Sequence, residues 1–277
     1  MNPLSKHFRH PKIYIKLPSG GKWYAPGSLN MPETGELPVM SMTGRDELMV
    51  KNADALMNGA ATVEMIQSCI PNIRDAWQIP RSDIDTILLA VRIATYGAEM
   101  QTTSKCPHCS HSNEHTVDCT WILDNIKQPD WDATASLGDL ILMLKPAKYQ
   151  TTNMINMDSY EEGKMLNQIN QPGISDEQKT DIIGRTMKKM AGMLADRLAS
   201  SIDYILTPDG VKVTDSAQIR EFIDNADKET FDQLRKLLEN YTQGYSLPRL
   251  SVSCEECGKQ YDTAIEFDPS NFFVRAS

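Results

Sequence analysis

The sequence lacks the long apolar runs, the signal segment and the excess of positive charge that would point to a membrane, to export or to nucleic acid. No apolar run reaches the roughly 18 residues that a membrane span needs, and residues 1–16 are polar and basic without the apolar core of a signal peptide. The 28 Lys and Arg residues are outnumbered by 37 Asp and Glu residues, which gives a net charge of −9. Nucleic-acid affinity comes mostly from cations that displace counterions. We therefore expect a cytosolic protein without a phosphate-binding surface.

The motifs of common enzyme active sites are also missing. The chain contains no HExxH, no GxSxG, no P-loop and no GxGxxG between a strand and a helix. The glycines of Ser19-Gly20-Gly21 lack the following Lys and Ser or Thr of a phosphate loop. Carboxylates at helix N-caps ordinarily cap the helix, and carboxylates on polar faces ordinarily contact solvent. We therefore expect that the protein is not an enzyme.

Four of the six cysteines form two CxxC pairs, Cys106 with Cys109 and Cys254 with Cys257. Each pair directs two thiolates into one small volume, and four thiolates about 2.3 Å from a common centre make the closed tetrahedral shell that structural zinc prefers. In a reducing compartment, cysteines are more often metal ligands or buried thiols than disulfides. The sequence therefore predicts one structural zinc ion bound by all four.

The separation of the two pairs has an architectural consequence. Between Cys109 and Cys254 lie 144 residues, far more than in an ordinary zinc finger. One ion bound by all four thiolates would close a loop that contains half of the protein.

Other uses of these residue types stay open at this point. His108, His111 and His115 lie near the first pair and could replace a cysteine as ligand. A redox pair at one CxxC is a second alternative, but neither CxxC has the βαβ context of a thioredoxin-type motif. Cys69, on a predicted helix, and Cys119, in a predicted strand, are expected to be buried thiols.

Hydrophobic periods and turn residues predict an α+β fold that is mainly helical. Residues 1–42 form an extended arm and β-hairpin in this prediction, and residues 43–99 an N-terminal helical region. Residues 100–120 and 250–268 are β-hairpins around the two CxxC pairs and form the halves of one split zinc ribbon. Residues 121–249 are a mainly helical body with a small hairpin, inserted between those halves.

Capping signals place several helices within these regions. Thr43 and Asp46 form a capping-box variant, Ser82 is predicted to cap a helix that ends at Gly97, and residues 149–170 are predicted to be helical. Ser175 opens a further capping box for a long amphipathic helix. We expect its apolar face to pack on the core; that face carries Ile182, Ile183, Met187, Met190, Leu194 and Leu198.

Three aromatic residues of the arm are candidate partner-binding residues: Tyr14, Trp23 and Tyr24. Their segment is too polar and too rich in proline to form a core of its own. Aromatic side chains in such a segment anchor it against a partner or against the main body. The sequence does not separate these two roles.

Two segments near the N-terminus, residues 15–24 (IKLPSGGKWY) and 35–47 (GELPVMSMTGRDE), resemble the opening of the baseplate hub assembly proteins of T-even-type contractile-tailed (myovirus) phages. The helix ending at residues 92–97 (RIATYG), the two CxxC pairs and residues 265–273 (IEFDPSNFF) continue the resemblance. It implies a non-enzymatic hub component or assembly chaperone. Its partners would be baseplate hub or tail proteins, including the tape-measure protein, met in the host cytoplasm during assembly and in the tail baseplate of the virion.

A zinc-ribbon nucleic-acid-binding module is the alternative that the residues themselves leave open. Such a module needs a basic stripe across the ribbon. Lys105 and Lys259 alone do not supply one.

Overall fold

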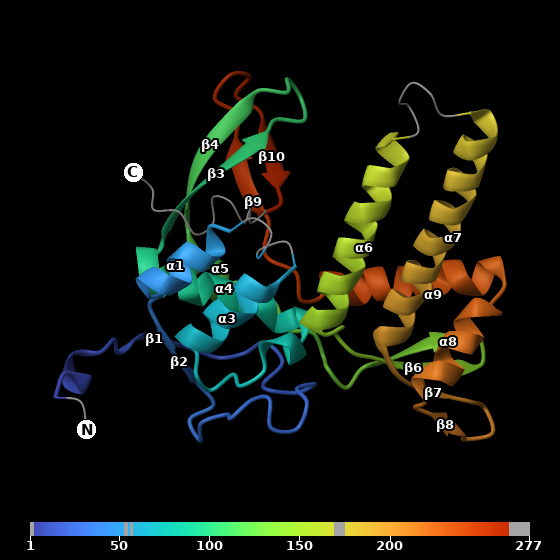
Figure 1. The fold of residues 1–277 in the computed structure, drawn as a ribbon, viewed down its shortest axis with the longest axis horizontal. Coiled ribbons are helices and arrows are strands. Elements are labelled where there is room, and N and C mark those ends of the chain that lie inside the picture. The colour runs from blue at the N-terminus through green and yellow to red at the C-terminus, as the bar shows by residue number, and fades with distance from the viewer. Residues whose placement is uncertain (1–2, 53–54, 56–57, 169–174, 266–277) are drawn as a thin grey trace. The chain divides into compact units, whose positions relative to one another are not determined.

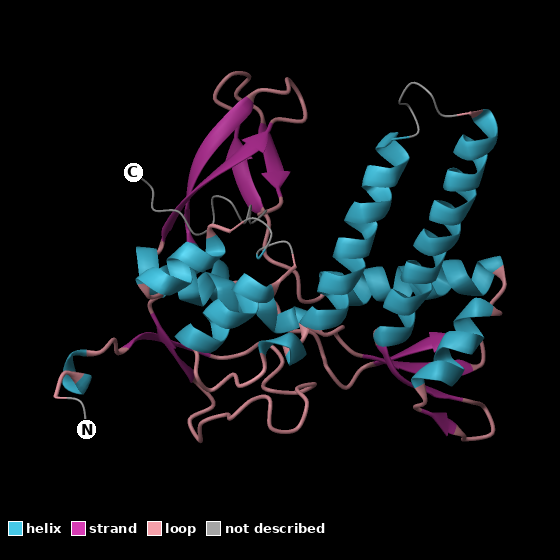
Figure 2. Cartoon of the chain, in the orientation of Figure 1, coloured by secondary structure: helices cyan, strands magenta, loops and turns pink. Residues whose placement is uncertain are grey.

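The computed structural model describes residues 3–52, 55, 58–168 and 175–265 of the 277-residue chain (Figure 1). The chain divides into two compact units. Unit 1 comprises residues 1–128 and 244–277, and unit 2 comprises residues 129–243. Both units combine helices with small antiparallel sheets (Figure 2), which confirms the predicted mixture of helix and sheet. None of the described helices is both long and apolar enough to cross a membrane.

Unit 1 contains three two-stranded antiparallel sheets and a group of helices. The sheets pair β1 with β2, β3 with β4, and β9 with β10. The described elements are η1 (Ser5–His7), β1 (Pro11–Ile15), β2 (Leu37–Met40), α1 (Gly44–Val50), α3 (Ala60–Cys69), η2 (Ala76–Gln78), α4 (Arg81–Tyr96), β3 (Glu99–Lys105), β4 (Ser112–Asp118), α5 (Cys119–Asp124), β9 (Leu250–Ser253) and β10 (Gln260–Thr263).

Much of the apolar core of unit 1 lies among α3, α4 and the segments that precede them. The largest fully buried side chains of this unit are Leu37, Met65, Ile66, Ile70, Ile73, Ile79, Ile87, Leu89 and Ile122. Residues of β1 and β2 alternate inward, as expected for a sheet with one buried face. The predicted arm is therefore part of the body from β1 onwards.

A partly buried ion pair joins the N-terminal segment to this core. Arg9 Nη1 lies 3.4 Å from the Asp46 carboxylate, and its guanidinium also donates to the carbonyl oxygens of Ser41 and Ser68 at 2.6 Å each. Asp46 is buried and completes the predicted capping box with Thr43. The segment from Arg9 onwards is thus held by the same carboxylate that starts α1.

The described residues of unit 2 form a four-stranded antiparallel sheet with the strand order β5-β6-β7-β8 and four helices. Its elements are β5 (Thr134–Leu137), β6 (Leu140–Leu144), α6 (Tyr149–Gln168), α7 (Asp176–Ser200), β7 (Ile202–Leu206), β8 (Lys212–Val213), α8 (Ser216–Asp224) and α9 (Lys228–Gln243). The core of this unit is formed by Leu137, Leu142, Leu144, Ala195, Leu198, Ala199, Ile202, Ile205, Ile219, Ile223, Leu234 and Leu238. Only the last turns of α7 contribute to that core.

The rest of α7 runs beside α6 in the opposite direction (Figure 1). Ser175 and Gln178 form the predicted capping box. The expectation that the apolar face of α7 packs on the core is wrong for its outer turns, because Ile183, Met187 and Met190 are exposed to 42%, 55% and 42%. The period of a helix shows which residues share a face, but not whether that face has a neighbour.

A polar contact takes the place of an apolar core between α6 and the outer part of α7. Glu162 is the one buried residue among the described side chains of α6, and its carboxylate lies 2.8 Å from Lys189 Nζ. The hydrogen bond from Lys189, followed by that from Thr186, lowers the pKa of Glu162. The hydrogen bond with Glu162 raises the pKa of Lys189.

These shifts predict an acid-sensitive pairing of α6 with α7. A carboxyl whose pKa is lower in the folded state stabilises that state above its ordinary value of 4.5, and the contribution disappears as the pH falls through the folded pKa. We expect Glu162→Gln to lower the Tm of the protein at pH 7 and to have a smaller effect at pH 3. Thermal unfolding of both proteins at the two pH values checks this; an equal difference at both would contradict it.

Two local predictions are corrected by the structure, and one strand had no prediction. Pro80, not Ser82, is the N-cap of α4, and the Ser82 hydroxyl donates to the Asp83 carboxylate. Cys119 begins helix α5 instead of lying in a strand, since the side chain of Asp118 caps that helix. Strand β5 was not predicted. Residues 169–170 of a predicted helix and 266–268 of a predicted hairpin region lie outside the described residues.

Candidate metal centre

The four CxxC cysteines lie in the loops of two β-hairpins of unit 1. One loop joins β3 to β4, and the other joins β9 to β10 (Figure 1). Both hairpins are antiparallel and regular, with Ser104 opposite Asn113 in the first and Val252 opposite Tyr261 in the second. A continuous ladder up to each loop fixes the direction in which the loop presents its sulfurs.

The two loops have the same backbone geometry. The N–H groups of Cys106 and Cys254 donate across the hairpin to His111 and Lys259, at 2.9 and 3.0 Å. The residue after the second cysteine of each pair returns its N–H to the carbonyl of the first cysteine and has a positive φ, 61° at Ser110 and 69° at Gly258. The turn therefore curls both cysteines of a pair around one point, and Gly258 adopts this conformation without strain.

The sulfurs of the two hairpins meet. Cys106 Sγ lies 3.7 Å from Cys257 Sγ, Cys109 Sγ lies 3.6 Å from Cys254 Sγ, and all four sulfurs are within 4.8 Å of one another. A tetrahedron with metal–sulfur distances of about 2.3 Å has edges of about 3.8 Å. A disulfide would bring two sulfurs to about 2.05 Å. The separations therefore fit four thiolates around one metal ion and exclude a disulfide between the hairpins.

Against the lowering effect of the His111 backbone, burial and hydrogen bonds with the other three sulfurs raise the pKa of Cys109 to about 12, whereas the pKa of Cys254 is lowered. The backbone N–H of Cys257, followed by that of Glu256, lowers the pKa of Cys254 to about 6 against the opposing effect of burial. Four thiolates in so small a volume repel one another, and a divalent cation at the centre removes that repulsion. Cys106 and Cys254 are buried, whereas Cys109 and Cys257 lie at the surface. An ion could therefore enter from the side of the second cysteines.

A polar bridge that the sequence did not reveal holds the hairpins together beside the sulfurs. Asn113, fully buried, donates to the Tyr261 hydroxyl at 3.0 Å and accepts from the Glu255 N–H at 2.9 Å. Ser104 lies 2.7 Å from the same hydroxyl. Nothing in the spacing of these residues singles them out, because they come together only when β3–β4 and β9–β10 face each other.

The histidines near the first pair are not part of the sulfur cluster. His115 Nε2 lies 2.8 Å from the Ser104 hydroxyl, in the bridge just described. His108 and His111 are exposed. The grouped ligand atoms come from the four cysteines.

The three candidate partner-binding residues occupy different surroundings. Tyr14 is 62% exposed on β1. Trp23 and Tyr24 are half-buried, and the Trp23 Nε1 and Tyr24 hydroxyl groups are buried without a hydrogen-bond partner among the described residues. The Tyr24 hydroxyl nevertheless lies close enough to the Asp83 carboxylate that burial and this charge raise its pKa.

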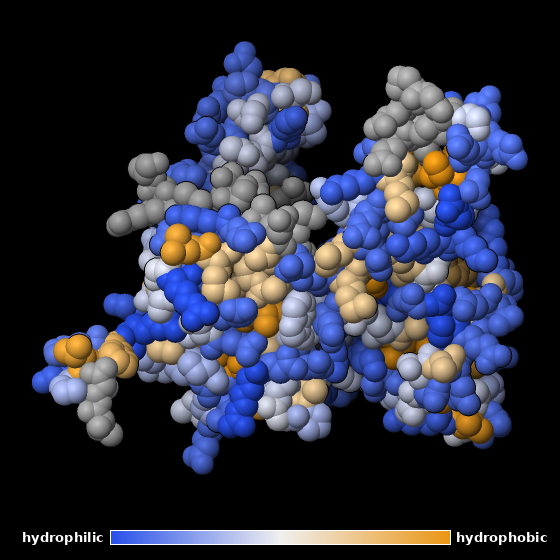
Figure 3. Space-filling view, in the orientation of Figure 1, coloured by the Kyte–Doolittle hydropathy of each residue, from blue (hydrophilic) through white to orange (hydrophobic). Residues whose placement is uncertain are grey.

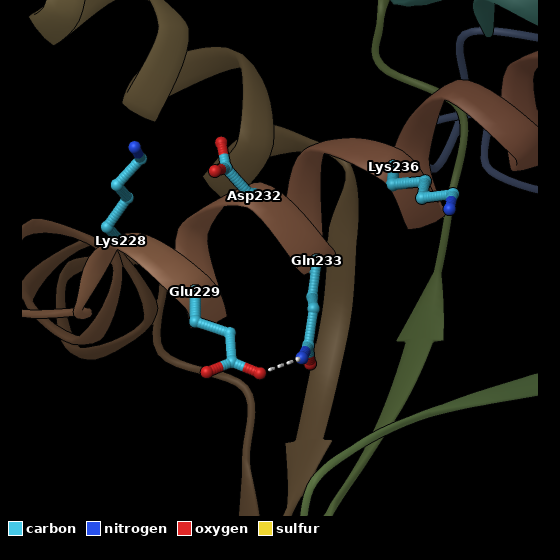
Figure 4. A pocket seen from close by; sticks show the side chains of 5 residues that line it. All are labelled: Lys228, Glu229, Asp232, Gln233 and Lys236. Atoms are coloured by element: carbon cyan, nitrogen blue, oxygen red, sulfur yellow. Dashed lines mark hydrogen bonds between the residues drawn. The ribbon is translucent and has the colours of Figure 1, made fainter.

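Unit 2 carries an open hollow. It is lined along the surface of α9 by Lys228, Glu229, Asp232, Gln233 and Lys236 (Figure 4). The Gln233 amide donates to the Glu229 carboxylate at 3.3 Å. Charges of both signs on exposed turns of one helix are an ordinary solvated surface, and no reactive group points into the hollow.

The fold is a mixture of helices and small antiparallel sheets, and it brings four cysteine sulfurs together at one point. The chain matches a family described as T4 bacteriophage base plate protein over residues 10–274, and it belongs to that family. This match confirms the resemblance to T4-type phage baseplate proteins. Searches of curated proteins and of solved structures found no match.

Proposed function

We propose that the protein is a baseplate hub assembly protein, a hub component or an assembly chaperone, that acts through protein contacts and performs no reaction. Baseplate proteins work by binding other baseplate or tail proteins, so membership of the family supports contacts of this kind. Hub or tail proteins, including the tape-measure protein, are the proposed partners. The host cytoplasm and then the tail baseplate are the proposed places of action.

We propose further that Cys106, Cys109, Cys254 and Cys257 bind one structural zinc ion and that the two hairpins are one zinc ribbon. The observation that supports this proposal is that two sulfur pairs across the hairpins lie 3.7 and 3.6 Å apart, near the edge of about 3.8 Å of a zinc–thiolate tetrahedron, with all four sulfurs within 4.8 Å. A shell of four thiolates leaves no position for water, so the metal would stabilise and not catalyse. In this role the metal would hold the loop of Cys106 and Cys109 against the loop of Cys254 and Cys257.

A nucleic-acid-binding role for the ribbon has less support. Glu255 and Glu256 are exposed in the second metal loop, next to the sulfurs. Lys105 and Lys259 are exposed as well, but two lysines beside two glutamates leave the loop without net positive charge. A phosphate backbone would gain little from this surface.

The N-terminal arm is the part of unit 1 that we propose for partner binding, in a narrower form than the sequence indicated. Ile15, Leu17, Leu37 and Val39 are buried, so removal of residues 1–40 would take away part of the core. Leu4, Phe8 and Tyr14 are exposed to 63%, 56% and 62%. Three large apolar side chains on a short segment that ends in β1 fit the contact surface of a partner.

We predict that deletion of residues 2–8 combined with Tyr14→Ala abolishes co-purification with hub proteins from infected cells and leaves the protein folded. Arg9 and its partners remain in this variant, so its Tm should fall by less than about 3 °C. Tyr160→Ala in unit 2, at a side chain that is 47% exposed, is a control for loss of a surface aromatic residue. Retained binding by the arm variant would contradict the role of the arm.

Mass spectrometry of purified particles, run beside that co-purification, separates the two forms of the proposal. A hub component is present in the particle, and a chaperone is present only in the cell extract. A full-length protein that binds no baseplate or tail protein in either sample would overturn the proposed function.

A further inference from the structure

One buried side chain contacts both of the loops that carry the cysteine pairs. The first CxxC loop comprises residues 106–111, and the second comprises residues 254–259. Asn113 is fully buried at the start of β4, and its amide nitrogen donates to the His111 carbonyl of the first loop at 3.3 Å. Its amide oxygen accepts from the Glu255 N–H of the second loop at 2.9 Å. A single amide group therefore joins the backbones of the two loops.

The partners of Asn113 fix the orientation of its amide. A backbone N–H can only donate and a backbone carbonyl can only accept, so the oxygen must face Glu255 and the nitrogen must face His111. The nitrogen also donates to the Tyr261 hydroxyl, at 3.0 Å. The oxygen and both N–H groups of the amide are thus used. An aspartate in this place would offer no donor, and a leucine no polar atom at all.

The Tyr261 ring links the same amide to the buried cysteines. It forms a small apolar cluster with Cys106 and Cys254, the first cysteine of each pair, and Val252 packs against this cluster. The face of the two hairpins that Figure 3 shows is mainly hydrophilic. Apolar packing therefore holds the first cysteine of each pair, whereas the hydrogen bonds of Asn113 hold the loops that lead to the second.

The hydrogen bonds of Asn113 involve no sulfur, so they can form before an ion is bound. With the loops held in this way, the two sulfur pairs across the hairpins lie 3.7 and 3.6 Å apart. The CxxC pairs are separated by 144 residues in the chain, and an ion that met them unaligned would have to close that long loop as it bound. Alignment before binding removes this entropy cost from the binding step. Residues that orient metal ligands typically change metal affinity by about 10- to 100-fold.

We propose that Asn113 is a positioning residue of the metal centre, which aligns the two CxxC loops before the ion binds and so raises the affinity for zinc. The inference rests on the proposed zinc centre, because Asn113 acts on the four cysteines through their loops. It also gives an order of assembly. The two hairpins dock first, and the ion then binds to a site that is already formed.

Competition between the purified full-length chain and a chromophoric chelator measures the zinc affinity. We expect Asn113→Ala to lower this affinity by about 10- to 100-fold. Val117→Ala is the matched control, because Val117 is buried on the same strand but pairs with Met100 at the end of the ladder far from the loops. This control should destabilise the hairpin and leave the zinc affinity within about threefold of the wild type.

Amide hydrogen exchange of the metal-free wild-type protein tests the order of assembly without any substitution. The Glu255 N–H donates to a buried oxygen, so we expect it to exchange about tenfold or more slowly than an unstructured amide in the absence of metal. Exchange of this amide at the unstructured rate in the metal-free protein would overturn the inference, because the loops would then not be aligned before the ion binds.

Two results of the zinc competition would also overturn the inference: wild-type affinity in Asn113→Ala, or an equal loss of affinity in Asn113→Ala and Val117→Ala. In both cases the wild type still binds zinc, and the proposed metal centre stands. A wild-type protein that binds no zinc refutes the proposed metal centre and this inference with it.

Discussion

Replacement of Cys254 by Ser is expected to remove the metal and to lower the Tm of the protein by about 10 °C or more. Serine offers a poor ligand where the Cys254 thiolate is stabilised by two backbone N–H groups. With three ligands left, the ion no longer ties the hairpin β9–β10 to β3–β4. The polar bridge through Asn113 then remains as the contact between them.

Metal content by mass spectrometry and thermal unfolding measure the two parts of this result. A double variant, His108→Asn with His111→Asn, is the control, because these exposed side chains lie outside the sulfur cluster and should leave both values unchanged. A strong chelator should bring the wild type to the Tm of Cys254→Ser. An unchanged Tm in Cys254→Ser would refute the stabilising role of the metal.

The second large effect is expected at Asp83, the fully buried carboxylate of α4. It accepts hydrogen bonds from the Ser19 N–H at 2.9 Å, the Ser19 hydroxyl at 2.5 Å and the Ser82 hydroxyl at 3.1 Å. These bonds fasten the turn at Ser19, 64 residues away in sequence, to the first turn of the helix. Asp83→Ala would leave the Ser19 groups buried without partners. We expect a loss of about 3 kcal/mol in the free energy of unfolding at pH 5.

The pH dependence of stability distinguishes two effects of Asp83, the cost of burying its charge and the contribution of its hydrogen bonds. Burial raises the pKa of Asp83 from 3.8 to about 6. A carboxyl whose pKa is higher in the folded state contributes stability that is fully present below its unfolded pKa and is lost as the pH rises through the folded pKa. A pKa that is higher by about two in the folded state lowers the free energy of unfolding by about 3 kcal/mol between pH 4 and pH 7.

Asp83→Asn is the matched variant, because its amide oxygen can still accept from the Ser19 N–H and it carries no charge. Urea unfolding should show the wild type losing stability relative to Asp83→Asn as the pH rises from 4 to 7. Asp83→Ala should be less stable than Asp83→Asn at every pH in this range. A constant difference between wild type and Asp83→Asn would contradict the raised pKa.

Local signals in the sequence predicted local structure well. The capping boxes at Thr43 and Ser175 are present, because a capping box depends on a few neighbouring residues. The proximity of the four sulfurs was also predictable, since each CxxC supplies two of the four thiolates that a tetrahedral metal site needs.

Features that depend on distant neighbours escaped prediction. Asn113 and Tyr261 are unremarkable in sequence and form the bridge between hairpins only in the folded unit. Asp83 looked like an ordinary residue near a helix start, yet it binds a turn that precedes it by 64 residues. Ile183, Met187 and Met190 have the period of a core-facing helix, yet all three are exposed. In each case the missing information was the identity of the neighbour.

X-ray absorption at the zinc edge of the purified wild-type protein tests the central claim most directly. The four sulfur positions predict one zinc ion per chain with four sulfur neighbours at about 2.3 Å and no nitrogen neighbour. A protein purified without any metal after growth in zinc, or a spectrum that requires a histidine nitrogen or a water oxygen in the shell, would contradict the account.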